Sequence, residues 1–114
     1  MKHETLAEAE RLFYADGRND GAWNIELEPS DIRDHSADHI VARERRAAVR
    51  DMRRMSAWEA ARDHASTNRE ARRLFKAYLD GQGAGLRYQI KRFKWDVDEN
   101  ERWEKAAASE HKGR

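Results

Sequence analysis

The sequence contains no cysteine, which excludes two kinds of architecture. Neither a disulfide framework nor a thiolate zinc site can form without cysteine side chains. The absence is also typical of reducing compartments, and residues 1–12 carry no apolar run resembling a signal peptide. We therefore expect a cytoplasmic protein. We expect no membrane contact, because no stretch approaches the roughly 18 apolar residues of a membrane-spanning helix.

Large aliphatic side chains are scarce as well. Leu, Ile, Val and Phe together supply 16 of the 114 residues, whereas Ala alone supplies 18. Alanine favours helices and lets them approach closely, and a single proline leaves room for long helices. The composition predicts one small, mostly α domain of four to five helices over residues 1–114, with a thin core. Residues 109–114 are expected to form a frayed tail.

Two segments leave open an α+β alternative with a minor antiparallel sheet of two or three strands. Residues 22–28 alternate apolar and polar side chains and are closed by Pro29. Residues 86–97 also alternate, and their aromatic and β-branched content favours strand over helix. The competing helical interpretation places four apolar residues on one face, namely Leu86, Ile90, Phe93 and Val97.

Polar residues and glycines predict where the helices begin and end. Ser36 is expected to open the longest helix, over about residues 37–55. Gly17 is expected to close a helix as a left-handed cap. Another helix is expected to stop at Gly81, and residues 81–85 are expected to form a flexible linker. Capping boxes, in which a short polar residue is followed three positions later by Glu, predict helix starts at Thr5, Ser56, Thr67 and Asp98.

The expected core is built largely from aromatic residues, in place of the missing aliphatic ones. Trp58 is expected to be buried, together with two of the three other tryptophans, Trp23, Trp95 and Trp103. The clearest amphipathic pattern follows Thr67, and its apolar face comprises Ala71, Leu74, Phe75, Tyr78 and Leu79.

Charge is distributed unevenly along the chain. Residues 1–42 hold ten acidic and four basic residues, whereas residues 43–73 hold ten arginines and five acidic residues. Five of these arginines fall within an arc of about 100° on the helix expected over residues 37–55. We call them the arginine stripe: Arg43, Arg46, Arg50, Arg53 and Arg54.

Two further basic clusters follow the arginine stripe. The second occupies the polar face of the next amphipathic helix, and the third mixes cations with aromatic side chains. Guanidinium groups bind phosphate in a bidentate manner, and exposed aromatic rings stack on bases. If the clusters share a surface, they predict a nucleic-acid interface. The members are Arg69, Arg72, Arg73 and Lys76 in the second cluster, and Arg87, Lys91, Arg92, Lys94 and Trp95 in the third.

We therefore expect a small non-enzymatic binding protein whose basic helical face contacts nucleic acid or a nucleoprotein complex. One alternative is an inhibitor or adaptor, encoded by a phage or mobile element, that binds a host protein through its charged surfaces. Another is a structural homo-oligomer, such as a dimer, in which the acidic third of one copy meets the arginine stripe of the next. A third is that the stripe is merely solvated, or paired within the chain by Glu26, Glu28, Asp31, Asp34 and Asp38.

Signs of catalysis and metal binding are weak. The sequence has no G-x-S-x-G elbow, no P-loop and no G-x-G-x-x-G loop, so we expect no enzyme, no cofactor and no small-molecule substrate. Asp31, His35 and His39 would share a face if residues 31–39 were helical, as metal ligands can. No further ligand can be identified, and the interpretation as ordinary surface histidines is favoured over a metal site.

Overall fold

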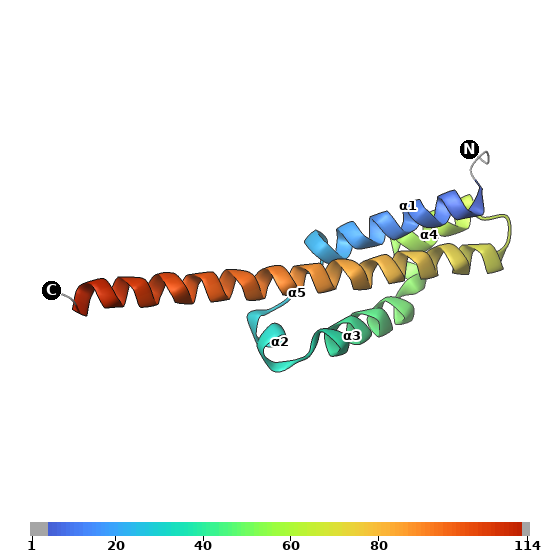
Figure 1. Cartoon of the computed structure of the whole chain (residues 1–114). Coiled ribbons are helices and arrows are strands. Elements are labelled where there is room, and N and C mark those ends of the chain that lie inside the picture. The colour runs from blue at the N-terminus through green and yellow to red at the C-terminus, as the bar shows by residue number, and fades with distance from the viewer. Residues whose placement is uncertain (1–4, 113–114) are drawn as a thin grey trace.

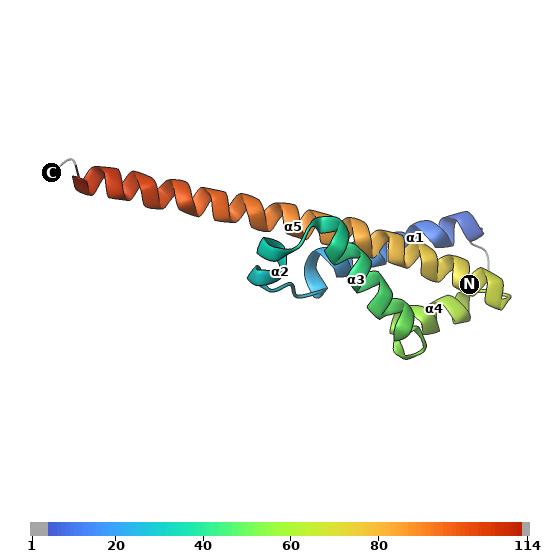
Figure 2. The ribbon, with the colours of Figure 1, turned by 90° about the horizontal axis from the view of Figure 1, so that it is seen from below.

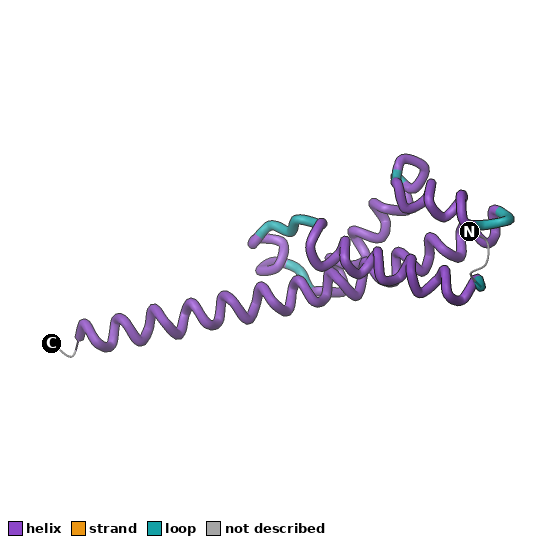
Figure 3. Tube along the Cα trace, turned by 90° about the horizontal axis from the view of Figure 1, so that it is seen from above, coloured by secondary structure: helices purple, strands orange, loops and turns teal. Residues whose placement is uncertain are grey.

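The computed structural model describes residues 5–112, and every regular element in that range is helical (Figures 1 and 3). The prediction of a small, mostly α domain is confirmed, and the described residues form no strand. Within them, no helix combines the length and apolar character needed to cross a membrane. The elements are α1 (Leu6–Asn19), the π-helical turn η1 (Asp20–Asn24), α2 (Pro29–Asp34), α3 (Ala37–Arg50), the 3-10 turn η2 (Met52–Arg54), α4 (Ser56–His64) and α5 (Asn68–Lys112).

Helix α5 is the spine of the molecule. Its 45 residues span about 68 Å at 1.5 Å per residue, which accounts for the longest dimension of the 71 × 27 × 18 Å body. The helices α1, α3 and α4 pack around its first half, with α1 and α3 on opposite sides (Figures 1 and 2). Its second half projects beyond them. Residues 109–112 of the expected tail are helical, and residues 113–114 lie outside the described part.

The first half of α5 carries the predicted core face. All five residues of that face are buried, and they pack with Phe13 of α1, Ala48 of α3 and Trp58 of α4. A second, smaller cluster joins Ile32, Ile40 and Ile90, and so fastens α2 and α3 to the middle of α5.

Glycines bring α1 and α5 into backbone contact. The two helices run parallel, and a methyl group on Gly17 would overlap the carbonyl oxygen of Tyr78, while one on Gly81 would overlap that of Tyr14. Gly21 and Gly85 repeat the arrangement one turn further along. On each side of this contact the glycines are four residues apart. This spacing places them on one helix face, where they allow the two backbones to approach closely.

The prediction that Gly17 and Gly81 end helices is wrong for this reason. Helix α1 continues through Gly17 to Asn19, α5 runs unbroken through residues 81–85, and the described glycines all have negative φ. A left-handed cap needs positive φ. A glycine on the buried side of a helix serves close approach equally well, and the local sequence does not distinguish the two uses.

The strand alternative fails at residues 22–28 because α1 does not stop where expected. The chain passes directly from α1 into η1, so Trp23 is helical. The amide of Gln89 on α5 donates hydrogen bonds of 2.8 Å to the carbonyl oxygens of Gly21 and Ile25. The hydroxyl of Tyr78 donates another, of 2.5 Å, to Asp20. Side chains of α5 thus provide hydrogen-bond partners for the polar groups of η1 and its C-terminal end.

The strand prediction for residues 86–97 is likewise wrong, and the helical alternative is right. Leu86 and Ile90 are buried one turn apart, whereas Tyr88 and Trp95 are exposed. The aromatic residues Tyr88 and Trp95 favoured a strand in the sequence because aromatic residues are common in strands. In the structure they lie on the surface of a helix. Helix α5 also continues through Asp98, so the capping box predicted there begins no new helix.

The other predicted boundaries have mixed outcomes. Thr5 caps α1 with Glu8, and Ser36 caps α3 with a bond of 3.1 Å from the His39 amide. The amide of Glu70 donates to the Thr67 hydroxyl at 3.2 Å, as predicted. Ser56 is instead the first residue of α4, and α3 ends at Arg50 rather than near residue 55.

The tryptophans divide differently from the prediction. Trp58 is buried as expected, but Trp23, Trp95 and Trp103 are all more than half exposed. The core closes without them because alanine and glycine let the helices approach closely. Three large rings are therefore left on the surface.

Candidate nucleic-acid interface

The second and third basic clusters share one side of α5. Three exposed cations of the second, Arg69, Arg73 and Lys76, recur eighteen residues later as Arg87, Lys91 and Lys94. Eighteen residues make five turns of an α-helix, so both triplets point in the same direction, about 27 Å apart. Two members of the clusters point in other directions. Arg72 lies eighteen residues before Ile90 and therefore points in the direction of that buried side chain. Arg92 extends toward the ring of Trp23.

Helix α3 borders this side of α5 through the Arg45–Asp80 and Arg87–Asp38 pairs, but the arginine stripe does not extend across it. Helix α3 packs on the side of α5 away from α1 (Figures 1 and 2). Arg46 and Arg50 are exposed on it, while Arg53 and Arg54 fall in the 3-10 turn and leave the helical register. Arg43 is half-buried and donates to Asp31 at 2.8 Å. The five arginines therefore do not form one continuous stripe.

Pairing with the acidic front third is real but limited. Besides Arg43–Asp31, the guanidinium of Arg73 lies 3.0 Å from Glu10, and Arg87 lies 2.6 Å from Asp38. The ammonium of Lys76 contacts Asp80 at 3.0 Å. In contrast, no ion pair among the described side chains of residues 5–109 involves Arg69, Lys91 or Lys94.

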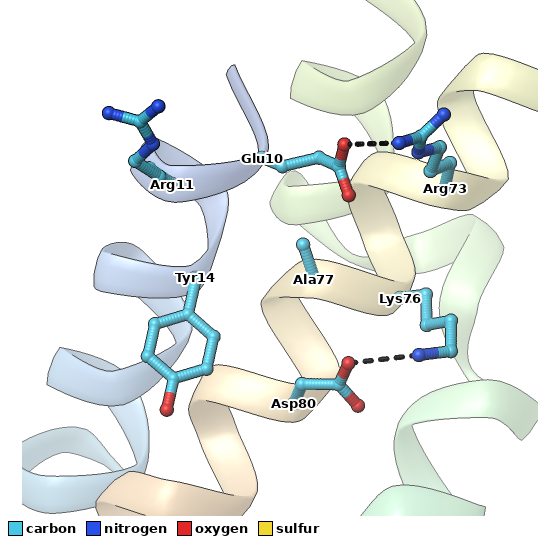
Figure 4. A pocket seen from close by; sticks show the side chains of 7 residues that line it. All are labelled: Glu10, Arg11, Tyr14, Arg73, Lys76, Ala77 and Asp80. Carbon is cyan, nitrogen blue, oxygen red and sulfur yellow. Dashed lines mark hydrogen bonds and ion pairs between the residues drawn. The ribbon is translucent and has the colours of Figure 1, made fainter. Parts of the chain in front are cut away.

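A groove runs beside α5 where α1 packs against it (Figure 4). Its first part has a volume of about 440 Å³ and is lined from α1 by Glu10, Arg11 and Tyr14. The α5 wall supplies Arg73, Lys76, Ala77 and Asp80. Figure 4 shows the Glu10–Arg73 and Lys76–Asp80 pairs on the α5 side, the Tyr14 ring beside α1 and the Arg11 side chain turned away from α5. Cations exceed carboxylates here by three to two.

The groove continues along the same seam with a different lining. Its second part, of about 460 Å³, shares Tyr14 with the first and adds Arg18, Trp23 and Tyr88. No carboxylate lines this part among the described residues. We call the two parts together the α1/α5 groove. Its charged and aromatic lining residues alternate along the seam: Arg11, Tyr14, Arg18 and Trp23 from α1 and η1, and Arg73, Lys76 and Tyr88 from α5.

The aromatic end of the groove is organised by direct contacts. The rings of Trp23 and Tyr88 meet edge to face with centroids 6.0 Å apart, and the guanidinium of Arg92 lies 4.4 Å from the centre of the Trp23 ring. Such a cation–π contact stabilises both groups in an exposed position. Lys91 and Trp95 follow on the same side of α5, three and seven residues after Tyr88.

Asp80 is the main electrostatic obstacle in the groove. Partial burial opposes its ionisation, but hydrogen bonds from Lys76 and Arg45 outweigh that effect and hold the pKa of its carboxyl below the ordinary value. Asp80 is therefore ionised at neutral pH, and it engages two cations that an anionic ligand would otherwise meet.

Sequence reasoning missed the α1 wall. Arg11, Tyr14 and Arg18 follow the three- and four-residue spacing that places side chains on one helix face, but they lie in the acidic third of the chain. The net charge of that third concealed them. The local spacing was the available signal.

Beyond the groove the character of α5 changes. Trp103 is 72% exposed on the projecting half, and one arginine stands among the carboxylates around it. The carboxylates between Trp95 and Lys105 are Asp96, Asp98, Glu99, Glu101 and Glu104.

The histidine pair gives no metal centre. His35 follows α2 and His39 belongs to α3, so Asp31, His35 and His39 do not share one helix. The two imidazoles stack with centroids 4.3 Å apart. Among residues 5–109, whose side chains the structure describes, no group of three or more His, Cys, Asp or Glu side chains could hold a metal ion.

Comparison with protein-family models, curated proteins and solved structures finds no match for this chain. Its function must therefore be inferred from the chemistry of its own surfaces.

Proposed function

We propose that the protein binds nucleic acid along the α1/α5 groove. The observation that carries this proposal is the occurrence of cationic and exposed aromatic side chains together in the two hollows of the groove, which share Tyr14. Cations attract and position phosphates, and aromatic rings offer faces on which bases stack. The groove needs no catalytic group for this role, so the proposed function is binding alone.

The cations are placed for a chain of phosphates rather than for one isolated anion. From Arg73 to Tyr88 the α5 wall measures about 23 Å, and Arg11 and Arg18 belong to the α1 wall. Glu10 and Asp80 weaken the first part of the groove, whereas Arg18, Lys91 and Arg92 surround its aromatic end. We expect the strongest contacts at that end.

The test is the affinity of the full chain for a labelled oligonucleotide, measured by fluorescence anisotropy over a range of salt concentrations. The double variant Arg18→Ala/Lys91→Ala removes one cation from each wall. We expect roughly tenfold weaker binding and a salt dependence whose log–log slope is shallower by about two, one unit for each lost phosphate contact.

The matched control is Arg46→Ala/Arg50→Ala, which removes two exposed cations from α3. We expect it to keep its affinity within about twofold, because these residues line neither part of the groove. If the control loses binding while the groove variant keeps it, the interface lies on α3. No binding even at low salt would exclude nucleic acid altogether.

A further inference from the structure

The groove presents flat rings to solvent, not merely charge. Tyr14, Trp23 and Tyr88 line the groove, and Trp95 follows on α5 just beyond it; all four are between 40% and 62% exposed. From these rings we infer that the bound nucleic acid is single-stranded, with its bases stacked on the aromatic side chains. The inference rests on the binding proposed above and specifies its ligand.

The rings are spaced along the groove as successive platforms. The backbone of Tyr14 lies against Gly81, Tyr88 follows seven residues after that glycine, and Trp95 a further seven. Each interval corresponds to about 10 Å along the helix axis. Cations occupy the gaps, with Arg18 near Tyr14 and Lys91 between Tyr88 and Trp95.

Arg92 makes the central platform larger. Its guanidinium covers one face of the Trp23 ring at 4.4 Å. A base can stack either on that planar guanidinium or on the indole after the guanidinium moves aside. Each arrangement keeps a positive charge next to the phosphate that accompanies the base.

A duplex does not match this surface. In a double helix the bases are already stacked, so exposed rings would meet only sugar and phosphate. The groove is also concave between two helices whose backbones are in contact, and each helix is about 10–12 Å wide. The pair is therefore too wide to enter a major groove about 12 Å across.

The projecting part of α5 does not offer the duplex another site. It is a single helix of suitable width, but residues 96–104 carry five carboxylates and one arginine. Phosphates on either side of a DNA groove would repel such a helix. The acidic segment instead marks where the strand leaves the molecule, just beyond Trp95.

The experiment compares a 20-nucleotide oligo(dT), an oligo(U) of the same length and a mixed-sequence duplex, each titrated into the full chain. We expect both single strands, or one of them, to bind at least tenfold more tightly than the duplex and to quench tryptophan fluorescence. Trp23→Leu should weaken single-strand binding about tenfold, because a stacking contact is lost. Trp103→Leu, at an exposed tryptophan outside the groove, should change affinity less than twofold.

If Trp23→Leu unfolds by circular dichroism, Trp95→Leu replaces it with the same expectation. Equal affinity for duplex and single strand, with no effect of either groove substitution, would overturn the single-strand inference and leave electrostatic binding in place. Failure to bind any of the three ligands would overturn the proposed function itself. Loss of binding in Trp103→Leu alone would also contradict the inference.

Discussion

Asp80 illustrates how one residue can restrain the groove. Its carboxylate forms ion pairs with Lys76 and Arg45, each at 3.0 Å. Asp80→Asn would remove one negative charge from the lining and release both cations. Because an exposed ion pair contributes about 0.2–1 kcal/mol, we expect oligonucleotide affinity to rise about two- to fivefold, measured by anisotropy at constant salt.

The control for this prediction is Asp34→Asn. Asp34 pairs with the exposed Arg33 of α2 at 3.1 Å, so its substitution changes the net charge equally at a position away from the groove. An equal gain in affinity from both variants would show that only net charge matters. That result would contradict a specific role for Asp80.

Individual residues were predictable where local spacing determined their environment. The five-residue apolar face after Thr67 is buried as predicted, since a 3.6-residue period with alanine at its edges fits only an inward helix face. The exposure of Trp23 and Trp95 was not predictable. Whether a large ring packs inside depends on how closely other helices approach, and that distance is set by backbone contacts of Gly17, Gly21, Gly81 and Gly85 that join segments about 60 residues apart in the sequence.

At the scale of elements, the α1–α5 contact depends on glycines, which let the two backbones touch because they have no side chain. Gly81→Ala would force the two helices apart, because the added methyl group overlaps the Tyr14 carbonyl. Although alanine favours the helical conformation by about 1 kcal/mol, we expect a net loss of at least about 2 kcal/mol of unfolding free energy. Urea denaturation followed by circular dichroism measures it.

Gly83→Ala is the matched control within the same helix. A methyl group there meets only the Val41 side chain, at 3.1 Å, and Val41 is partly exposed and can shift. We expect a stability within about 1 kcal/mol of the parent, because helix propensity offsets the tight contact. If both variants are equally stable, the backbone contact between α1 and α5 does not hold the fold together.

Elements were predictable by type more reliably than by length. Caps at Thr5 and Ser36 were recognised from the sequence because a short polar side chain satisfies a free amide locally. The continuity of α5 was not, because a glycine-rich segment fits either a linker or a close helix contact. The candidate site shared this difficulty. Its α5 wall was foreseen as basic residues with interspersed aromatics, but its α1 wall becomes adjacent only through the unbroken helices.

The whole molecule is elongated, and its basic and acidic residues are concentrated in different parts of it. Its radius of gyration is 19.2 Å, against about 13 Å for a compact chain of this length, because half of α5 has no helix beside it. The packed half of α5 contributes to the basic, aromatic groove. The projecting half carries Trp103, and most of the charged side chains near that residue are carboxylates. The interpretations as a host-protein inhibitor or adaptor and as a homo-oligomer stay predictions, and the exposed Trp103 is where a protein partner would be sought first.

The central claim is that nucleic acid lies along the α1/α5 groove, and the four tryptophans report on it directly. Each indole N–H gives one signal in a nitrogen–proton correlation spectrum, assigned by single substitutions and followed as a 20-nucleotide single strand is added. We expect the Trp23 and Trp95 signals to shift, while those of buried Trp58 and remote Trp103 stay in place. Shifts confined to Trp58 or Trp103, or binding without any shift at Trp23 and Trp95, would contradict that claim.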